Sequence, residues 1–142
     1  MTDYTALNET ALKSDLMRDE GVRLKPYRCT AGKLTIGVGR NLDDVGLSAG
    51  EVATLLDSDI ARVVGELDQA LPWWHQMSEP RQRALANMAF NLGVPRLLGF
   101  RKMVQALAQG QYDEAARQAL ASKWAEQVGA RAQRLAQMIK EG

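Results

Sequence analysis

The chain has 142 residues and a mass of 15.6 kDa, and its 46% hydrophobic and 25% charged residues are ordinary for a single globular domain. This composition excludes a collagen-like, low-complexity or wholly disordered chain. The single cysteine, Cys29, excludes an intrachain disulfide framework and a cysteine-cluster zinc site. The single histidine, His75, excludes a multi-histidine metal site. We therefore expect neither a metal nor any other cofactor.

The net charge of +1 hides an asymmetry between the two halves of the chain. Residues 1–71 carry 8 Lys/Arg against 12 Asp/Glu, whereas residues 72–142 carry 10 against 5. A basic half suits an anionic polymer such as nucleic acid or cell-envelope material. It is equally typical of a solvated helical surface rich in arginine, so the charge alone leaves both interpretations open.

Targeting signals are not evident in the sequence. The first 20 residues lack the apolar core of 7–15 residues that an export signal needs. No run approaches the roughly 20 apolar residues that span a bilayer. We expect a protein that is made in the cytoplasm and has no stable membrane insertion.

The first predicted helix carries Leu7, Ala11, Leu12 and Leu16 at helical spacing and ends at Gly21. A hairpin follows it. Residues 24–28 form one strand, residues 30–33 the turn, and the second strand contains an alternating pattern.

In that second strand Leu34, Ile36 and Val38 alternate with a threonine and two glycines, Thr35, Gly37 and Gly39. Because successive side chains of a strand point to opposite faces, the two sets lie on opposite sides. We expect the apolar side to pack on the core and the threonine–glycine side to face outward, where a ligand can approach the backbone closely.

Ser48 and Glu51 have the spacing of a capping box, which opens a long amphipathic helix that ends before Pro72. Four further helices are predicted, from about 79 to 92 and over 100–109, 112–121 and 130–141. The fold class is therefore α+β and mostly α. We expect one domain of residues 1–142, with an N-terminal lobe over about 12–50, a connecting helix over about 48–71 and a helical C-terminal lobe over about 72–142.

The most informative motif is Glu20, eight residues, Cys29, five residues, and then Thr35-Ile36-Gly37-Val38-Gly39. Each residue alone has an ordinary explanation: an exposed helix-end carboxylate, a small buried thiol and a strand-forming threonine. Together they resemble the phage-type lysozymes, the endolysins of glycoside hydrolase family 24. The resemblance runs from about Leu12 to Met138 and implies a lysozyme-like fold, with Glu20, Cys29 and Thr35 as the catalytic triad.

The same resemblance nominates four substrate-binding residues. Phe90 and Asn91 match a segment that lines the sugar cleft, and Gln118 matches a cleft-facing amide. Arg131 stands where the family has an arginine that pairs with the catalytic glutamate. Without the resemblance, the ordinary interpretations are a core aromatic, a helix-end amide and a surface charge.

Two positions depart from the commoner family pattern. Arg40 follows Gly39 where many members have a histidine, and Cys29 replaces the more usual aspartate.

The resemblance implies a muramidase that hydrolyses the β-1,4 bond between N-acetylmuramic acid and N-acetylglucosamine and so lyses the host cell. Glu20 is expected to be the acid, while Thr35 and Cys29 position the water or the Cys29 thiolate acts as base. Alternatives are a lytic transglycosylase acting on the same bond and a non-catalytic module that binds murein or nucleic acid.

The expected partner is peptidoglycan, with no nucleic acid. We expect a monomer in the host cytoplasm that reaches periplasmic peptidoglycan after a holin-type protein permeabilises the membrane.

Overall fold

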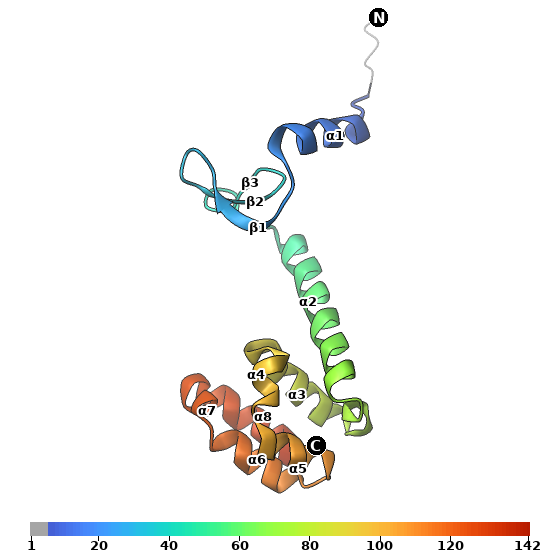
Figure 1. Ribbon diagram of the computed structural model, residues 1–142, viewed down its shortest axis with the longest axis vertical. Helices are drawn as coiled ribbons and strands as arrows, with labels where there is room; N and C mark the ends of the chain where they lie inside the picture. Colours follow the sequence, from blue (N-terminus) through green and yellow to red (C-terminus); the bar gives the residue numbers. More distant parts are fainter. Residues whose placement is uncertain (1–5) are drawn as a thin grey trace, which may run out of the picture. The chain divides into compact units, whose positions relative to one another are not determined.

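A computed structural model describes residues 6–142 of the protein. The chain forms two compact units. The first unit ends at Val52 and the second begins at Ala53, so the division falls inside helix α2 (Ala49–Ala70). Figure 1 labels the elements of both units.

The first unit begins with helix α1 (Glu9–Glu20). Asn8 caps its start, because the Asn8 side-chain oxygen accepts from the Ala11 amide at 3.0 Å. The helix ends where the amide of Gly21, at φ 75°, donates to the Met17 carbonyl. The predicted helix end at Gly21 is therefore confirmed, and it makes Glu20 the last residue of α1.

A three-stranded antiparallel sheet follows, in the order β1 (Arg23–Arg28), β2 (Leu34–Gly37) and β3 (Arg40–Asn41). The predicted hairpin is β1 and β2. The third strand was not predicted, because two residues are too few to show a period. Since β2 is the central strand, Thr35 lies between Tyr27 of β1 and Asn41 of β3.

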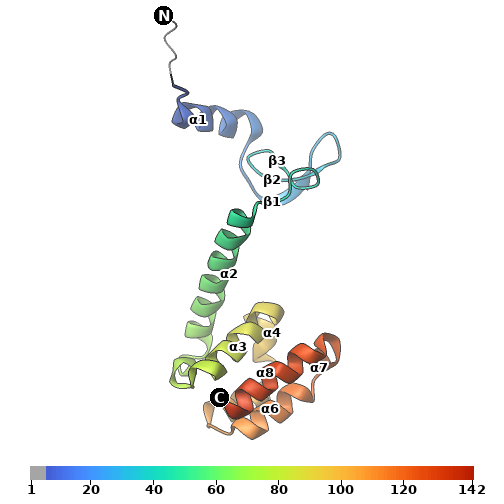
Figure 2. The same ribbon diagram turned by 180° about the vertical axis from the view of Figure 1, so that it is seen from behind.

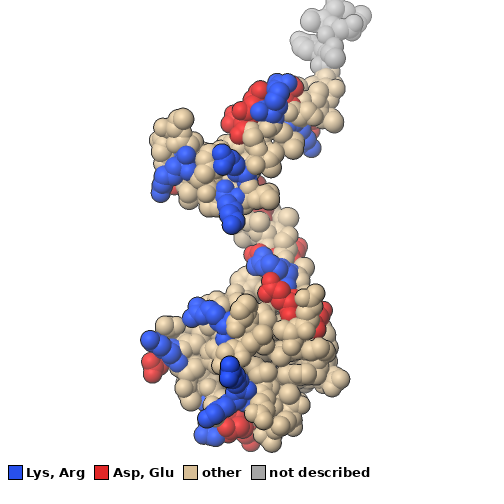
Figure 3. Space-filling view, in the orientation of Figure 1, with Lys and Arg blue, Asp and Glu red and all other residues tan. Residues whose placement is uncertain are grey.

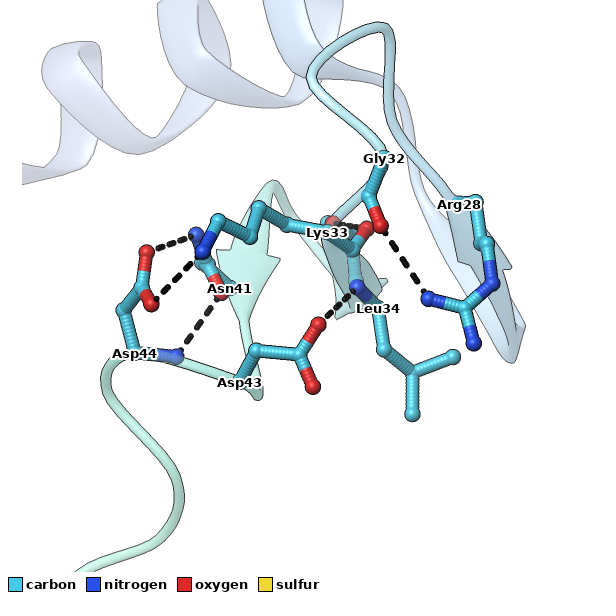
Figure 4. Close-up of polar contacts among 8 residues, drawn as sticks. Arg28, Gly32, Lys33, Leu34, Asn41, Asp43 and Asp44 are labelled. Atoms are coloured by element: carbon cyan, nitrogen blue, oxygen red, sulfur yellow. Dashed lines mark hydrogen bonds and ion pairs between the residues drawn. The ribbon is translucent and has the colours of Figure 1, made fainter.

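The loop after β3 is fastened to the sheet by polar contacts, which Figure 4 shows. The Leu34 amide donates to the Asp43 carboxylate at 2.8 Å, and the Lys33 ammonium lies 3.2 Å from the Asp44 carboxylate. Asp44 also exchanges two hydrogen bonds with the Asn41 side chain, at 2.9 and 3.0 Å. These bonds hold the chain beyond β3 against the start of β2.

The predicted capping box is present. The Glu51 amide donates to the Ser48 hydroxyl at 3.1 Å, and the Ser48 amide donates to the Glu51 carboxylate at 2.9 Å. Helix α2 then runs for 22 residues and ends at Ala70, two residues before Pro72. The predicted long helix is confirmed.

The second unit is helical and contains the hydrophobic core. After the 3-10 helix η1 (Trp74–Gln76) come α3 (Glu79–Leu92), α4 (Val94–Leu98), α5 (Arg101–Ala108), α6 (Tyr112–Leu120), α7 (Lys123–Val128) and α8 (Ala130–Glu141). Helix α8 packs against α3 and α6 (Figure 2). Helix α5 packs against α6. The largest fully buried side chains are apolar and come from α2, α3, α4, α5 and α8: Leu67, Leu85, Met88, Leu97, Met103 and Ile139.

Glycines end or separate most of these helices, as predicted from the sequence. Gly93 follows α3, Gly110 lies between α5 and α6, and Gly129 lies between α7 and α8. Helices α4 and α7 and the 3-10 helix were not predicted. In residues 6–142, no helix combines the length and the apolar character that crossing a membrane requires.

Candidate active site

Glu20 is held by the turn that joins β2 to β3. A Cβ atom added at Gly39 would lie 2.6 Å from Oε2 of Glu20, 2.9 Å from its Cδ and 3.2 Å from its Cγ. The carboxyl group therefore rests directly against the Cα of Gly39. Gly39 also has φ 65°, a conformation that side chains disfavour. Position 39 thus favours glycine for two reasons: the positive φ of its backbone and the close approach of the Glu20 carboxyl group.

Cys29 and Thr35 lie together at the opposite end of β2. Cys29 follows β1 and begins a tight turn, in which its amide donates to the Lys33 carbonyl at 2.9 Å and its carbonyl accepts from Gly32 at 2.8 Å. The thiol is half-buried. Hydrogen bonds from the backbone of Lys33 and of Ala31, with a smaller contribution from the Thr35 hydroxyl, lower the pKa of the Cys29 thiol below its ordinary value.

The expectation that Thr35 faces outward is wrong. Thr35 is 3% exposed, whereas Val38, assigned to the core side, is 40% exposed. Thr35 lies inside the sheet, paired with Tyr27 of β1 and Asn41 of β3, whereas Val38 lies beyond the end of β2 in an exposed turn. Its hydroxyl donates to the Lys33 carbonyl at 2.9 Å, so a polar group is buried without losing a hydrogen bond.

Arg40, the departure from the family pattern, forms an ion pair. Its guanidinium reaches Glu51 through two nitrogens, with Nη1–Oε1 at 2.7 Å and Nη2–Oε2 at 2.5 Å. Nη1 also donates to the Gly46 carbonyl at 3.1 Å. The Ser48 amide, first, and then the Arg40 guanidinium lower the pKa of Glu51 to about 2.

Two of the predicted substrate-binding residues share a pocket in the second unit. Phe90 and Arg131 line a pocket of about 360 Å³, together with apolar residues of α2 such as Leu56 and Ile60. Phe90 is 44% exposed, so it is not the core aromatic of the ordinary interpretation. Arg131 donates to the Asn87 side-chain oxygen from Nε at 3.0 Å and from Nη2 at 2.7 Å.

The other two substrate-binding residues have different surroundings. Asn91 is exposed, and its oxygen accepts from the indole of the buried Trp124 at 2.8 Å. Gln118 is half-buried, donates to Glu114 at 2.8 Å and lines a second pocket, of about 350 Å³, beside the start of α5. The four nominated residues thus belong to one unit but not to one pocket.

The structure adds residues that the sequence did not nominate. Gly39 holds Glu20, Asn87 holds Arg131, and Glu51 holds Arg40. The sequence gives a signal for Gly39, in the family motif, and for Glu51, in the capping box, but it does not indicate that Gly39 contacts Glu20 or that Glu51 binds Arg40. Among the described residues, no group of three or more His, Cys, Asp or Glu side chains could hold a metal ion.

Charged side chains of both signs lie on the surface of the second unit. On the face drawn in Figure 3, the basic and acidic side chains of the second unit are interspersed over a broad uncharged surface. Several of its arginines are also paired with carboxylates: Arg62 with Asp59, Arg83 with Glu79, and Arg117 with Glu114. Two of these pairs, those of Arg83 and Arg117, lie in the C-terminal half, so part of its basic excess is paired locally.

The chain is similar to known lysozymes and an endolysin. The family model "Phage lysozyme" matches residues 17–140. The chain is 30% identical to the pre-baseplate central spike protein Gp5 of Enterobacteria phage T4 over 89% of its own length, but it spans only 27% of that relative. It is 25% identical to probable T4-type lysozyme 2 of Dictyostelium discoideum, covering 94% of this chain and 95% of that protein. An endolysin of Acyrthosiphon pisum secondary endosymbiont phage 1 is 31% identical over 56% of this chain and 55% of its own.

The family match covers most of the chain, including all seven nominated site residues. The chain therefore belongs to the phage lysozyme family. By class it is a lysozyme, a glycoside hydrolase that acts on peptidoglycan.

Proposed function

We propose that this protein is an endolysin that hydrolyses the β-1,4 bond between N-acetylmuramic acid and N-acetylglucosamine, and that Glu20, Cys29 and Thr35 carry the reaction. The observation that supports this most is the arrangement around β2. One end of the strand has the Cys29–Thr35 pair, and the turn at the other end holds the Glu20 carboxyl group against Gly39.

Glu20 is proposed as the general acid. Cleavage of a glycosidic bond needs a proton on the leaving oxygen as the bond to the anomeric carbon breaks. Within residues 6–52 the Glu20 side chain forms no ion pair or side-chain hydrogen bond, so this unit leaves its oxygens available to a sugar. The contact with Gly39 restricts the carboxyl group without using its donor or acceptor capacity.

Cys29 and Thr35 are proposed to handle the water. In this scheme the water oxygen attacks the anomeric carbon, its proton passes to the Cys29 thiolate, and the Glu20 proton passes to the departing N-acetylglucosamine oxygen. A lowered pKa increases the thiolate fraction of Cys29 at neutral pH, which favours the base role. The Thr35 hydroxyl, buried beside the thiol, would orient the water or the sulfur.

In the second unit, Phe90, Asn91, Gln118 and Arg131 remain our proposed substrate contacts. An exposed aromatic ring such as Phe90 suits the apolar face of a sugar, and the amides and the guanidinium suit its hydroxyl and carbonyl groups. We propose that the protein acts as a monomer.

Transglycosylation is the second candidate, and one feature favours it. The triad contains a single carboxylate, since a thiol replaces the second acid of the commoner pattern. A transglycosylase needs one acid–base group and no attacking water, because the sugar's own 6-hydroxyl closes on the anomeric carbon. Hydrolysis leaves reducing ends on the murein, whereas transglycosylation leaves 1,6-anhydro ends.

We further propose that the protein lyses its host from the cytoplasm with the help of a holin-type pore. Cytoplasmic expression without membrane damage would then be tolerated, and permeabilising the membrane would cause lysis. Prompt lysis of cells whose inner membrane is shown to be intact would contradict this route.

The experiment that tests the proposed function compares wild type with Glu20→Gln on purified murein and on cells with a permeabilised outer membrane. Loss of a general acid lowers rates by roughly 10²–10⁴-fold, so activity should fall by about that much while the melting temperature stays unchanged. Glu9→Gln makes the same change at the other end of α1 and should keep full activity. A folded Glu20→Gln protein with more than about a tenth of wild-type activity would overturn the assignment.

A further inference from the structure

The carboxyl group of Glu20 depends on the turn beneath it. Because that group touches the Cα of Gly39, any displacement of Gly39 moves or releases it. Gly37, the last residue of β2, and Gly39, in the turn, both have positive φ, and Val38 between them is 40% exposed. Such a segment has little packing of its own to fix it. Whatever fixes the turn therefore also sets the position of Glu20.

Arg40, the residue directly after Gly39, connects the turn to other segments of the first unit. The backbone of Arg40 pairs with Ile36 across β2 and β3. Its side chain binds three acceptor oxygens on two other segments: both carboxylate oxygens of Glu51, at the start of α2, and the carbonyl of Gly46, at the end of the loop. The planar guanidinium matches a carboxylate with two parallel hydrogen bonds, which a lysine ammonium cannot reproduce.

The partner of Arg40 is itself immobilised. Glu51 belongs to the capping box, so its Oε1 also accepts the Ser48 amide at 2.9 Å, while its own amide donates to the Ser48 hydroxyl. Arg40 is thereby tied to the first turn of a 22-residue helix. The side chains of Arg40 and Glu51 are only 36% and 39% exposed, so water competes for the pair less than at an open surface.

We propose that Arg40 is a positioning residue for the lysozyme reaction. By joining the chain after Gly39 to Glu51 and Gly46, it holds the β2–β3 turn where Gly39 meets the Glu20 carboxyl group. The inference rests on the proposed function, because it assigns Arg40 an effect on Glu20. A purely stabilising ion pair would affect only unfolding. The Arg40–Glu51 pair also affects the reaction, through the contact between the Gly39 backbone and the Glu20 carboxyl group.

The test measures kcat and KM separately on soluble murein fragments, well below the melting temperature of the least stable variant. The variants are Arg40→Gln, Arg40→Lys and Glu51→Gln. A misplacement of a reacting group by about 1 Å costs on the order of 10²-fold in rate, so kcat should fall about 10- to 100-fold in Arg40→Gln with KM nearly unchanged. Arg40→Lys should recover only part of the loss.

Glu51→Gln should lower kcat in the same direction, because glutamine keeps the capping box but weakens the bond to Arg40. If Arg40→Gln does not fold, Glu51→Gln alone tests the proposal. The double variant should be no worse than Arg40→Gln alone, because both changes break one interaction. Arg62→Gln removes a comparable surface pair in the second unit and should leave both constants unchanged.

A folded Arg40→Gln or Glu51→Gln protein with wild-type kcat would overturn the inference, and so would a change confined to melting temperature. Glu20→Gln, measured in parallel, separates the two proposals. If Glu20→Gln is inactive while Arg40→Gln has wild-type kcat, only the positioning role fails. If Glu20→Gln keeps wild-type activity, the proposed function fails first.

Discussion

The Thr35 hydroxyl has one proton and two neighbours that can accept it. It donates to the Lys33 carbonyl at 2.9 Å, and it also lies beside the Cys29 sulfur. With a neutral thiol, the S–H can donate to the threonine oxygen while that bond to Lys33 persists. With a thiolate, the hydroxyl proton turns towards the sulfur. The pair can therefore stabilise either protonation state of Cys29, which suits a group that takes a proton from water.

This arrangement predicts that Cys29→Asp keeps substantial activity and that Cys29→Ala loses more. A carboxylate can accept the hydrogen bonds that now lower the pKa of the thiol, whereas alanine can neither hold the water nor take its proton. Melting temperature and murein-clearing rate should be measured side by side. Alkylation of the half-buried thiol should abolish activity, and bound oligosaccharide should slow the alkylation.

The opposite result would make Cys29 a packing residue. An Asp variant that is both unfolded and less active than the Ala variant would show that a charge cannot be accommodated there. The chemistry would then rest on Glu20 and Thr35.

At the scale of elements, the β2–β3 turn is the part of the fold on which the site depends most. Replacing Gly39 with alanine brings two penalties: the strain of a positive φ, about 1–2 kcal/mol, and a clash with the Glu20 carboxyl group. Gly32 has a similar φ of 76°, but nothing lies within 4 Å of an added Cβ atom. The two positions therefore separate backbone strain from contact with Glu20.

We predict that both Gly39→Ala and Gly32→Ala lower the free energy of unfolding, Gly39→Ala by at least as much, while only Gly39→Ala lowers the murein hydrolysis rate, by on the order of 10²-fold. Denaturant unfolding and initial rates on labelled murein provide the two measurements. Equal activity of the two variants would show that the Gly39 contact does not position Glu20.

The elements also show how far the sequence could lead. The ends of α1, α2 and α3 follow from Gly21, Pro72 and Gly93, because glycine and proline act on the local backbone. Strand β3 and helices α4 and α7 were missed, since two, five and six residues are too few to show a period.

The site was only partly predictable for a similar reason. Alternation along β2 separated the two faces but could not tell which face is enclosed, and Thr35 was assigned to the wrong one. The family motif supplied Glu20, Cys29 and Thr35. It could not supply the bond between Arg40 and Glu51, which are eleven positions apart and meet only once the loop after β3 has folded.

At the scale of the whole molecule, the two units have different means of support. The first unit relies on caps, the sheet and the polar loop network, and Thr35 is its one buried polar residue among those described. The second unit contains the buried apolar core. A polar cluster also joins α2 to α3: the ring nitrogens of His75 lie 2.9 Å from the Gln82 oxygen and 2.7 Å from the Asp68 carboxylate.

Both ring nitrogens of His75 face acceptors, so the charged imidazolium is favoured. The Gln82 oxygen, first, and then Asp68 raise the pKa of His75 above its ordinary 6.5. The stability that this cluster contributes is fully present below pH 6.5 and is lost as the pH rises through the folded-state pKa.

Because His75 is the only histidine, its proton NMR titration reports a single site. We predict a pKa above 6.5 in the wild type and a lower one in Asp68→Asn. The difference in melting temperature between the two proteins should shrink as the pH rises. A wild-type pKa of His75 at or below 6.5 would show that Gln82 and Asp68 do not stabilise the imidazolium.

Hydrolysis that depends on Glu20 can be measured most directly by mass spectrometry of murein digested in water labelled with heavy oxygen. After borohydride reduction, we expect fragments ending in muramitol, each carrying one oxygen from the solvent, and correspondingly few such fragments from Glu20→Gln in the same time. Ends of the 1,6-anhydro type without label would identify a transglycosylase. Ends in glucosaminitol would place the cut at the other glycosidic bond. Either result would overturn the proposed hydrolysis.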